Sequence, residues 1–346
     1  MTGRNKKDAT GSRFTLGALA AAGLGAVMGL KALRREPVSF KGRTVLISGG
    51  SRGLGLVMAR RFVAEGARVV LCAREEVELA RARDELERAG GEVLAVPCDV
   101  TDRVQVEALV ARVHERFGVV DVLVNNAGII QVGPLESMTE EDFEEAMNVH
   151  FWGPLYMTLA VLPEMKRRGW GRIVNVSSIG GRVSVPHLVP YSASKFALVG
   201  LSDGLRAELA QDGIRVTTVC PTLMRTGSPP NAFFKGDHEA EYAWFVTGDS
   251  LPLLSISAER AAGQIVEACR RGDAEALVGA TAKLAALART LAPELTAAVL
   301  AGINRMMPQD GSTERHRGRD SETPLTRSWV TQLTRWAALR NNELLH

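Results

Sequence analysis

The sequence predicts an α/β fold with a doubly wound parallel sheet, and two observations carry this prediction. Short β-branched runs alternate with longer amphipathic stretches from residue 42 to about residue 279. Strands separated by helices of this length imply right-handed crossovers and a parallel sheet covered on both faces. The runs at 44–48, 121–126 and 172–178 are continuously apolar rather than alternating, as strands buried on both faces require.

Each expected element follows from its local pattern. Strands are expected at residues 44–48, 68–72, 92–96, 119–124, 172–176, 214–219 and 275–279. Helices are expected at residues 53–65, 75–89, 104–117, 140–168, 191–211 and 257–271. The sequence thus alternates strand and helix through most of its length.

Four segments depart from this alternation. Residues 228–254 are rich in aromatic, proline and glycine residues, and such an irregular insertion after a strand is expected to form a substrate lid. Residues 282–307 predict two apolar helices divided at Pro293, and 312–320 predict a charged linker. A short amphipathic tail helix is then marked by its apolar residues, Leu325, Trp329, Leu333, Trp336 and Leu339. We therefore divide the chain into a leader (1–38), an α/β domain (40–280), a helical extension (281–310) and a linker with a tail helix (311–346).

The composition is that of a globular protein and argues against several classes of partner. Of 346 residues, 46% are hydrophobic and 23% are charged. Lys and Arg number 42 against 39 Asp and Glu, a formal net charge of +3, which gives no reason to expect nucleic acid as a partner. The four cysteines show neither a CxxC spacing nor an accompanying histidine at zinc-ligand distance, so no metal site is expected. They are interpreted as small buried residues in a reducing compartment.

A glycine-rich turn follows the first expected strand and opens the first expected helix. It reads Ser48, Gly49, Gly50, Ser51, Arg52, Gly53, Leu54 and Gly55. Glycines at these places allow a tight turn and a close approach of the backbone to a pyrophosphate, which the helix N-terminus would bind. Such a turn is weak evidence alone and much stronger between a strand and a helix.

The second expected strand indicates which dinucleotide is preferred. It ends at Cys72 and Ala73 and is followed by Arg74, whereas an enzyme that uses NAD usually has an acid there. Arg74 and Arg52 could hold a 2′-phosphate, so we expect NADP(H) to be favoured over NAD(H); the alternative is that both are solvated surface arginines. Asp99 and Val100, after the third expected strand, are expected beside the adenine; Asp99 could equally be a turn or N-cap residue.

In order and spacing, these motifs resemble those of the classical short-chain dehydrogenases/reductases, over roughly residues 42–279. The resemblance rests on the glycine turn, Asn125-Asn126-Ala127-Gly128, Ser178, and Tyr191-Ser192-Ala193-Ser194-Lys195. It implies a single Rossmann-type domain with a seven-stranded sheet, in which Asn125, Ala127 and Gly128 shape the adenosine region. The family commonly has Pro-Gly after the sixth strand; this chain has Pro221-Thr222, with Thr226 where a threonine usually meets the carboxamide.

The resemblance also implies a catalytic group of four residues. Tyr191 and Lys195 are four apart on an expected helix and so share a face. A free phenol has a pKa near 10, and a cation beside it would favour the phenolate, so Lys195 is expected to make Tyr191 a better proton donor and acceptor. Ser178 would donate to the substrate oxygen. Asn148 matches the family's fourth member, which would hold a water that links Lys195 to solvent. Neither His150 nor His187 has a partner carboxylate at a position in the sequence that would indicate a catalytic role.

The apolar run at 14–30 leaves three possibilities open. It holds 17 uncharged residues between basic ones, near the short end of what spans a bilayer. It could be a membrane anchor, a cleaved export signal, or a docked helix or unstructured leader. We favour the anchor, with the catalytic domain facing the cytosol, because export would remove the domain from cytosolic NADPH; the alternative is a cytoplasmic protein.

Taken together, the sequence predicts an NADP(H)-dependent oxidoreductase that interconverts an alcohol and a ketone or aldehyde, on a hydrophobic small molecule. Two alternatives are a nonenzymatic NADP(H)-binding scaffold or redox sensor, and an epimerase or dehydratase of nucleotide sugars, whose larger substrate domain this chain lacks. Family habit implies a homodimer or homotetramer. The sequence does not identify the substrate, the direction of reaction or its stereochemistry.

Overall fold

Seven parallel strands form the central sheet of the computed structural model, which describes residues 37–309, 311–328 and 331–344. The strands are β1 (Thr44–Ser48), β2 (Arg68–Ala73), β3 (Glu92–Pro97), β4 (Val122–Asn125), β6 (Gly171–Val176), β7 (Ile214–Pro221) and β11 (Glu275–Val278). Their order is β11-β7-β6-β4-β1-β2-β3, which confirms the predicted doubly wound α/β fold. The apolar run 14–30 lies outside the described residues.

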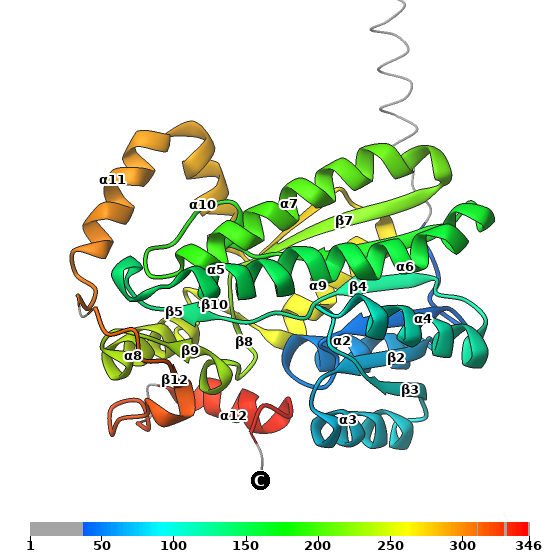
Figure 1. Cartoon of the computed structure of the whole chain (residues 1–346), viewed down its shortest axis with the longest axis horizontal. Helices are drawn as coiled ribbons and strands as arrows, with labels where there is room; N and C mark the ends of the chain where they lie inside the picture. The colour runs from blue at the N-terminus through cyan, green and yellow to red at the C-terminus, as the bar shows by residue number, and fades with distance from the viewer. Residues whose placement is uncertain (1–36, 310, 329–330, 345–346) are drawn as a thin grey trace, which may run out of the picture. The chain divides into compact units, whose positions relative to one another are not determined.

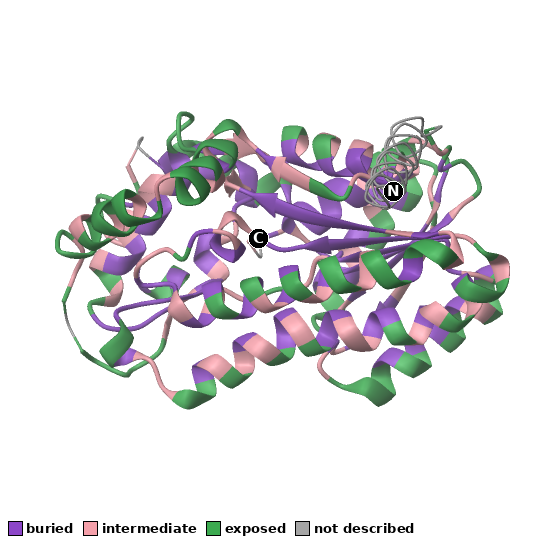
Figure 2. Cartoon of the chain, turned by 90° about the horizontal axis from the view of Figure 1, so that it is seen from above, coloured by how far each residue is buried: buried purple, intermediate pink, exposed green. Residues whose placement is uncertain are grey.

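Helices cover both faces of this sheet (Figure 1). One face packs against α2 (Gly53–Ala64), α3 (Glu76–Arg88) and α9 (Ala258–Arg271). The other face packs against α4 (Arg103–Phe117), α6 (Gly153–Arg168) and α7 (Val189–Leu209). Val45 and Ile47 of β1 belong to the first core and Leu46 to the second, as alternation along a strand requires. Figure 2 shows the strands of this sheet largely buried.

The strand order reverses between β1 and β4, and this positions the site. Chains that leave these two strands go to opposite faces, so a crevice opens at the carboxyl ends of the strands. The loops after β1, β2, β4, β6 and β7 all meet there, and they carry the glycine turn and the other predicted motifs.

The helix predicted at 140–168 is interrupted in the structure. It consists of α5 (Glu140–Met147), a π-helical turn over Asn148–Trp152, and α6. Pro154 lacks the backbone N–H that an uninterrupted α-helix would use at that point. The wider turn places the His150 side chain inward and leaves Asn148 exposed.

The lid segment at 228–254 is more regular than its composition suggested. Its second half is α8 (His238–Ser250), whose first turn is capped by the Asp237 side chain accepting from the Ala240 N–H. Tyr242 and Phe245 of this helix pack edge-on against Phe234. That residue belongs to β9 (Phe233–Phe234), which lies between β5 (Gln131–Val132) and β12 (His316–Arg317). The last of these strands lies in the segment that was expected to be a linker.

The remaining elements follow β11. Helices α10 (Ala280–Leu291) and α11 (Pro293–Asn304) meet at Pro293, as predicted, and extend away from the sheet (Figure 1). Two short strands, β8 (Leu223–Arg225) and β10 (Ser255–Ser257), pair separately. Across the ranges that the structure describes, no helix combines the length and hydropathy needed to cross a membrane.

The tail helix α12 (Gln332–Arg340) packs through a face of small residues, Thr334, Ala337 and Ala338. Thr334 is buried, and its hydroxyl donates to Asp249 (3.2 Å) and lies 2.7 Å from the Ser250 hydroxyl, both on α8. The apolar residues Leu333 and Trp336 are exposed instead. A hydrogen-bonded contact with α8 therefore fixes where the tail runs.

We predict that Asp249→Asn stabilises the fold at high pH. Burial raises the pKa of Asp249 to about 7. Because an unfolded aspartate titrates near pH 4, the stability that this carboxyl contributes is complete below pH 4 and is lost as the pH rises through about 7. Urea unfolding would measure the free energy of unfolding of both proteins at pH 5 to 8. The difference between variant and wild type should shift in favour of the variant by on the order of 2 kcal/mol from pH 5 to pH 8. Glu115→Gln, at an exposed site, is the control, and parallel curves for Asp249→Asn and wild type would contradict the prediction.

Candidate active site

The glycine turn is held against the end of β4 by a set of hydrogen bonds. The Asn126 amide donates to the Ser48 and Gly49 carbonyl oxygens, each at 3.1 Å. The Ser48 hydroxyl accepts from the backbone N–H groups of Asn126 and Ala127 at 3.0 and 3.1 Å. A methyl group added at Gly55 would overlap the Gly49 carbonyl oxygen. The turn thus has the close backbone approach for which glycine is required.

This turn fits the phosphates of a dinucleotide. Gly49 and Gly53 have φ of 63° and 54°, in the left-handed region that favours glycine. The first turn of α2 contains no acidic residue. The N-cap residue, Arg52, forms no capping hydrogen bond through its side chain. The backbone N–H groups at the start of α2 and the positive end of its dipole are therefore directed at an anion site.

A cavity of about 610 Å³ runs from the glycine turn to Tyr191 and Lys195. Most of the predicted cofactor residues line it: Gly49, Ser51, Arg52, Gly53, Leu54, Arg74, Asp99, Val100, Ala127, Gly128, Tyr191, Lys195 and Thr226. Asn126 of the same motif and Phe233 of the lid segment also line it, as do Ile129, Ile130 and Asn231, which the sequence did not single out. One continuous hollow therefore joins the expected phosphate end to the expected reacting end.

Four predicted binding residues lie behind the cavity wall rather than in it. Ser48 and Gly55 hold the glycine turn in shape, as described above. Asn125 is buried and donates to Asn175 on β6 at 2.8 Å. Pro221 ends β7 beside Val278 of β11.

Tyr191, Ser178 and Lys195 come together at the carboxyl ends of β6 and β7. Lys195 is 4% exposed, and its ammonium group donates to the Val176 carbonyl at 2.9 Å. Its Nζ lies 5.6 Å from the centre of the Tyr191 ring. The Ser178 hydroxyl forms a hydrogen bond with the Tyr191 hydroxyl and accepts from the Gly180 N–H. The phenol of Tyr191 and the buried amine of Lys195 thus line one end of the cavity, and Ser178, which does not line it, contacts the phenol.

Burial governs the protonation of this group. Burial raises the pKa of Tyr191, while its hydrogen bond with Ser178 acts in the other direction. Burial also lowers the pKa of Lys195 to about 7. In this structure the loss of hydration outweighs the hydrogen bond with Ser178, and the expected acidification of the phenol by Lys195 together with an oxidised nicotinamide stays a prediction.

The structure brings His150, and not Asn148, to this group. Asn148 is exposed and does not line the cavity, whereas His150 is buried and does. The His150 Nε2 accepts from the Ile129 N–H (3.1 Å), so Nδ1 carries the proton and donates to the Ser194 hydroxyl (2.8 Å). Its ring meets that of Tyr191 edge-on at 5.4 Å. The prediction assumed a regular helix and therefore missed His150, because the π-helical turn changes which side chain faces the site.

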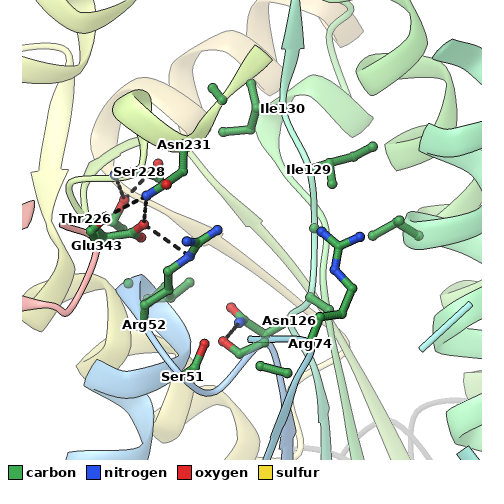
Figure 3. Close-up of a pocket in the computed structure, with 18 of the residues that line it drawn as sticks. Ser51, Arg52, Arg74, Asn126, Ile129, Ile130, Thr226, Ser228, Asn231 and Glu343 are labelled. Atoms are coloured by element: carbon green, nitrogen blue, oxygen red, sulfur yellow. Dashed lines mark hydrogen bonds and ion pairs between the residues drawn. The ribbon is translucent and has the colours of Figure 1, made fainter. Parts of the chain in front are cut away.

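The two predicted phosphate-binding arginines have different surroundings. Arg52 is paired with Glu78 at 3.0 Å and with Glu343 of the tail at 3.3 Å. Arg74 is exposed and, in the part of the chain that the structure describes, forms no ion pair. Figure 3 shows the Arg52 side chain directed toward Glu343 and Asn231, with Arg74 apart from that cluster.

The fold and the cavity define a dinucleotide-binding oxidoreductase, and comparison with known proteins gives the family. Residues 43–233 match the short chain dehydrogenase family. The chain is 34% identical over 268 residues to the dehydrogenase/reductase SDR family protein 7-like of Anopheles gambiae, covering 76% of this chain and 83% of that one. It therefore belongs to the short-chain dehydrogenase/reductase family and is an NAD(P)-dependent dehydrogenase/reductase.

Other relatives and solved structures agree with this placement. A putative ketoacyl reductase of granaticin polyketide synthase from Streptomyces violaceoruber is 43% identical over 183 residues, 52% of this chain and 67% of that one. A short-chain dehydrogenase from Streptomyces avermitilis superposes with a TM-score of 0.66 at 32% identity, over 76% of this chain and 98% of that one. A gluconate 5-dehydrogenase from Burkholderia cenocepacia, solved with NADP and tartrate, gives 0.62 at 26% identity, over 70% and 96%.

We predict that Gly55→Ala abolishes dinucleotide binding and destabilises the domain. The added methyl group would overlap the Gly49 carbonyl, and overpacking of this kind costs about 1–3 kcal/mol. Fluorescence titration with NADPH and thermal unfolding would measure both effects. Gly302→Ala on α11 meets nothing within 4 Å and should preserve binding and stability. Normal binding by Gly55→Ala would contradict the close packing described above.

Proposed function

We propose that this protein is an NADP(H)-dependent oxidoreductase that interconverts an alcohol and a ketone or aldehyde on a hydrophobic substrate. The observation that carries the proposal is one cavity that joins Tyr191 and Lys195 to the glycine turn, with the Ser178 hydroxyl as a partner of the Tyr191 hydroxyl. A scaffold that binds a dinucleotide without chemistry would have no need for two hydroxyl groups beside a buried amine at the far end of that cavity.

The proposed chemistry divides the work between the cofactor and the chain. The nicotinamide, when bound, supplies or takes up the hydride. In reduction, Tyr191 gives its hydroxyl proton to the substrate oxygen, and Ser178 donates a hydrogen bond to the same oxygen. Because burial keeps Tyr191 a neutral phenol, it is held in the protonation state that an acid needs. Oxidation of the alcohol reverses these transfers.

His150 takes the place that the sequence analysis gave to Asn148. Burial, followed by the charge of Lys195, lowers the pKa of His150 well below its ordinary value, so the ring is neutral. Nδ1–H donates to Ser194, whose hydroxyl donates to the Tyr191 carbonyl (2.8 Å). We assign His150 the role of a positioning residue that fixes the start of α7, and with it Tyr191.

The preference for NADP(H) rests mainly on Arg74. It follows β2 directly, lines the cavity and is not neutralised by a carboxylate within the described residues. Arg52, in contrast, is already paired with two acids. The NADP bound to the Burkholderia cenocepacia relative is consistent with this preference.

A hydrophobic substrate is suggested by the walls of the cavity near the lid. The apolar side chains that line this part are those of Ile129, Ile130, Met224 and Phe233. Membrane attachment through residues 14–30, with a cytosolic catalytic domain, and a homo-oligomeric state stay predictions of the sequence.

We predict that Tyr191→Phe loses at least about 100-fold in turnover while it still binds NADPH, because general acid catalysis contributes about 10²–10⁴-fold. A panel of apolar ketones and aldehydes followed by NADPH absorbance would measure turnover, and fluorescence would measure binding. Tyr156→Phe is the matched control, since Tyr156 stacks on Trp152 outside the cavity. Equal rates for Tyr191→Phe and wild type would refute the assigned role. Binding without turnover by the wild type across the panel would favour the scaffold alternative.

We predict that Arg74→Ala raises the KM for NADPH by about tenfold or more and leaves the KM for NADH unchanged. Hydrogen bonds to charged groups contribute about 1.5–3 kcal/mol, and 1.4 kcal/mol corresponds to a factor of ten. Steady-state kinetics with both cofactors would measure the split. Arg88→Ala, an exposed arginine at the end of α3, should change neither value. An equal loss with both cofactors would assign Arg74 to the adenosine rather than to the 2′-phosphate.

A further inference from the structure

The end of the tail crosses the glycine turn. The Gly53 N–H, at the start of α2, donates to the Asn341 carbonyl at 2.8 Å. The Asn342 side-chain amide donates to the carbonyl oxygens of Ser51 (2.8 Å) and Glu78 (3.0 Å). Residues near the C-terminus therefore occupy polar groups of the loop that we assign to the cofactor phosphates.

Glu343 places a carboxylate at the same point. Its Oε2 lies 3.3 Å from the Arg52 Nε and accepts from the Asn231 amide at 2.8 Å. Its Oε1 lies against Gly53, where an added methyl group would overlap it. The side chain is 4% exposed and lines the cavity. Figure 3 shows Glu343 meeting Arg52 and Asn231 above the glycine turn.

A carboxylate at this position meets the same needs as a phosphate. The N-terminus of a helix after a glycine turn attracts anions through free N–H groups and the helix dipole. Arg52 adds a guanidinium that can pair with either group. Two anions do not share one such place, because like charges at close range repel.

We propose that Glu343 competes with the cofactor phosphates for Arg52 and the start of α2, so that dinucleotide binding displaces the end of the tail. This inference rests on the proposed function. It makes Glu343 a determinant of cofactor affinity that acts from outside the glycine, tyrosine and lysine motifs.

The carboxylate is held less firmly than its contacts suggest. Burial raises the pKa of Glu343 to about 7, although Arg52 and Asn231 act in the other direction. Its charged form therefore gives up hydration that these partners do not fully replace. Helix α12, fixed to α8 through Thr334, would keep the displaced residues close to the cavity.

The first experiment compares the affinity of full-length variants for ligands with and without phosphates. Glu343→Gln keeps the shape of the side chain and removes its charge, and Glu314→Gln removes an exposed charge of the same tail outside the cavity. Calorimetric titration should show Glu343→Gln binding NADPH at least fivefold more tightly than wild type, within the range of a coupling between sites. Affinity for adenosine, which has no phosphate, should not change, and Glu314→Gln should match wild type with both ligands.

The second experiment follows the tail directly by hydrogen exchange. The amides of Asn341 and Glu343 donate to the carbonyl oxygens of Ala337 and Ala338. If NADPH displaces the end of the tail, these two amides should exchange faster when the ligand is bound. Slower exchange would mean that the tail closes over the ligand, and it would overturn the inference, as would equal or weaker NADPH binding by Glu343→Gln. If neither variant nor wild type bound NADPH or NADH, the proposed function itself would fail.

Discussion

The attachment of the glycine turn to the end of β4 is the constraint on which the rest of the structure depends. Asn126 and Ser48 form it through four hydrogen bonds, each worth about 1 kcal/mol net. Their larger effect is geometric, because the turn lies so close to its surroundings that Gly49 and Gly55 have no room for a side chain. This contact also fixes where α2 begins. The anion site, the position of Arg52 and one wall of the cavity follow from it.

The other end of the cavity depends on burial rather than on hydrogen bonds to solvent. Lys195 enters the site from α7 and is held by the Val176 carbonyl, while its own carbonyl accepts from the Ser177 hydroxyl. With so little water, the pKa of the amine falls to about 7 and that of the Tyr191 phenol rises. The charge of this end is therefore sensitive to whatever enters the cavity. An arriving group that carries charge would change both pKa values, since hydration no longer screens them.

Local patterns predicted most of this arrangement. The glycine turn and the Tyr191–Lys195 spacing depend on residues that are close in sequence, and alternating strands and helices specify the sheet. Asn148 and His150 show where local reasoning failed, because one π-helical turn changes which residue faces inward. The lid helix was missed because aromatic residues spaced for packing against Phe234 resemble an irregular segment in composition. Glu343 gave no local signal, since its contact with Arg52 joins opposite ends of the chain.

The two arginines at the cofactor site have separate electrostatic tasks as a result. Arg52 is balanced by Glu78 and Glu343, so a phosphate that pairs with it must first replace a carboxylate. Arg74 is balanced by no acid among the described residues, so its full attraction is available to an arriving phosphate. Affinity for the phosphates common to both dinucleotides would then be reduced by the tail, while discrimination for the 2′-phosphate would not. If both proposals hold, the tail would weaken cofactor binding without changing the preference between cofactors, because affinity and specificity would be governed by different side chains.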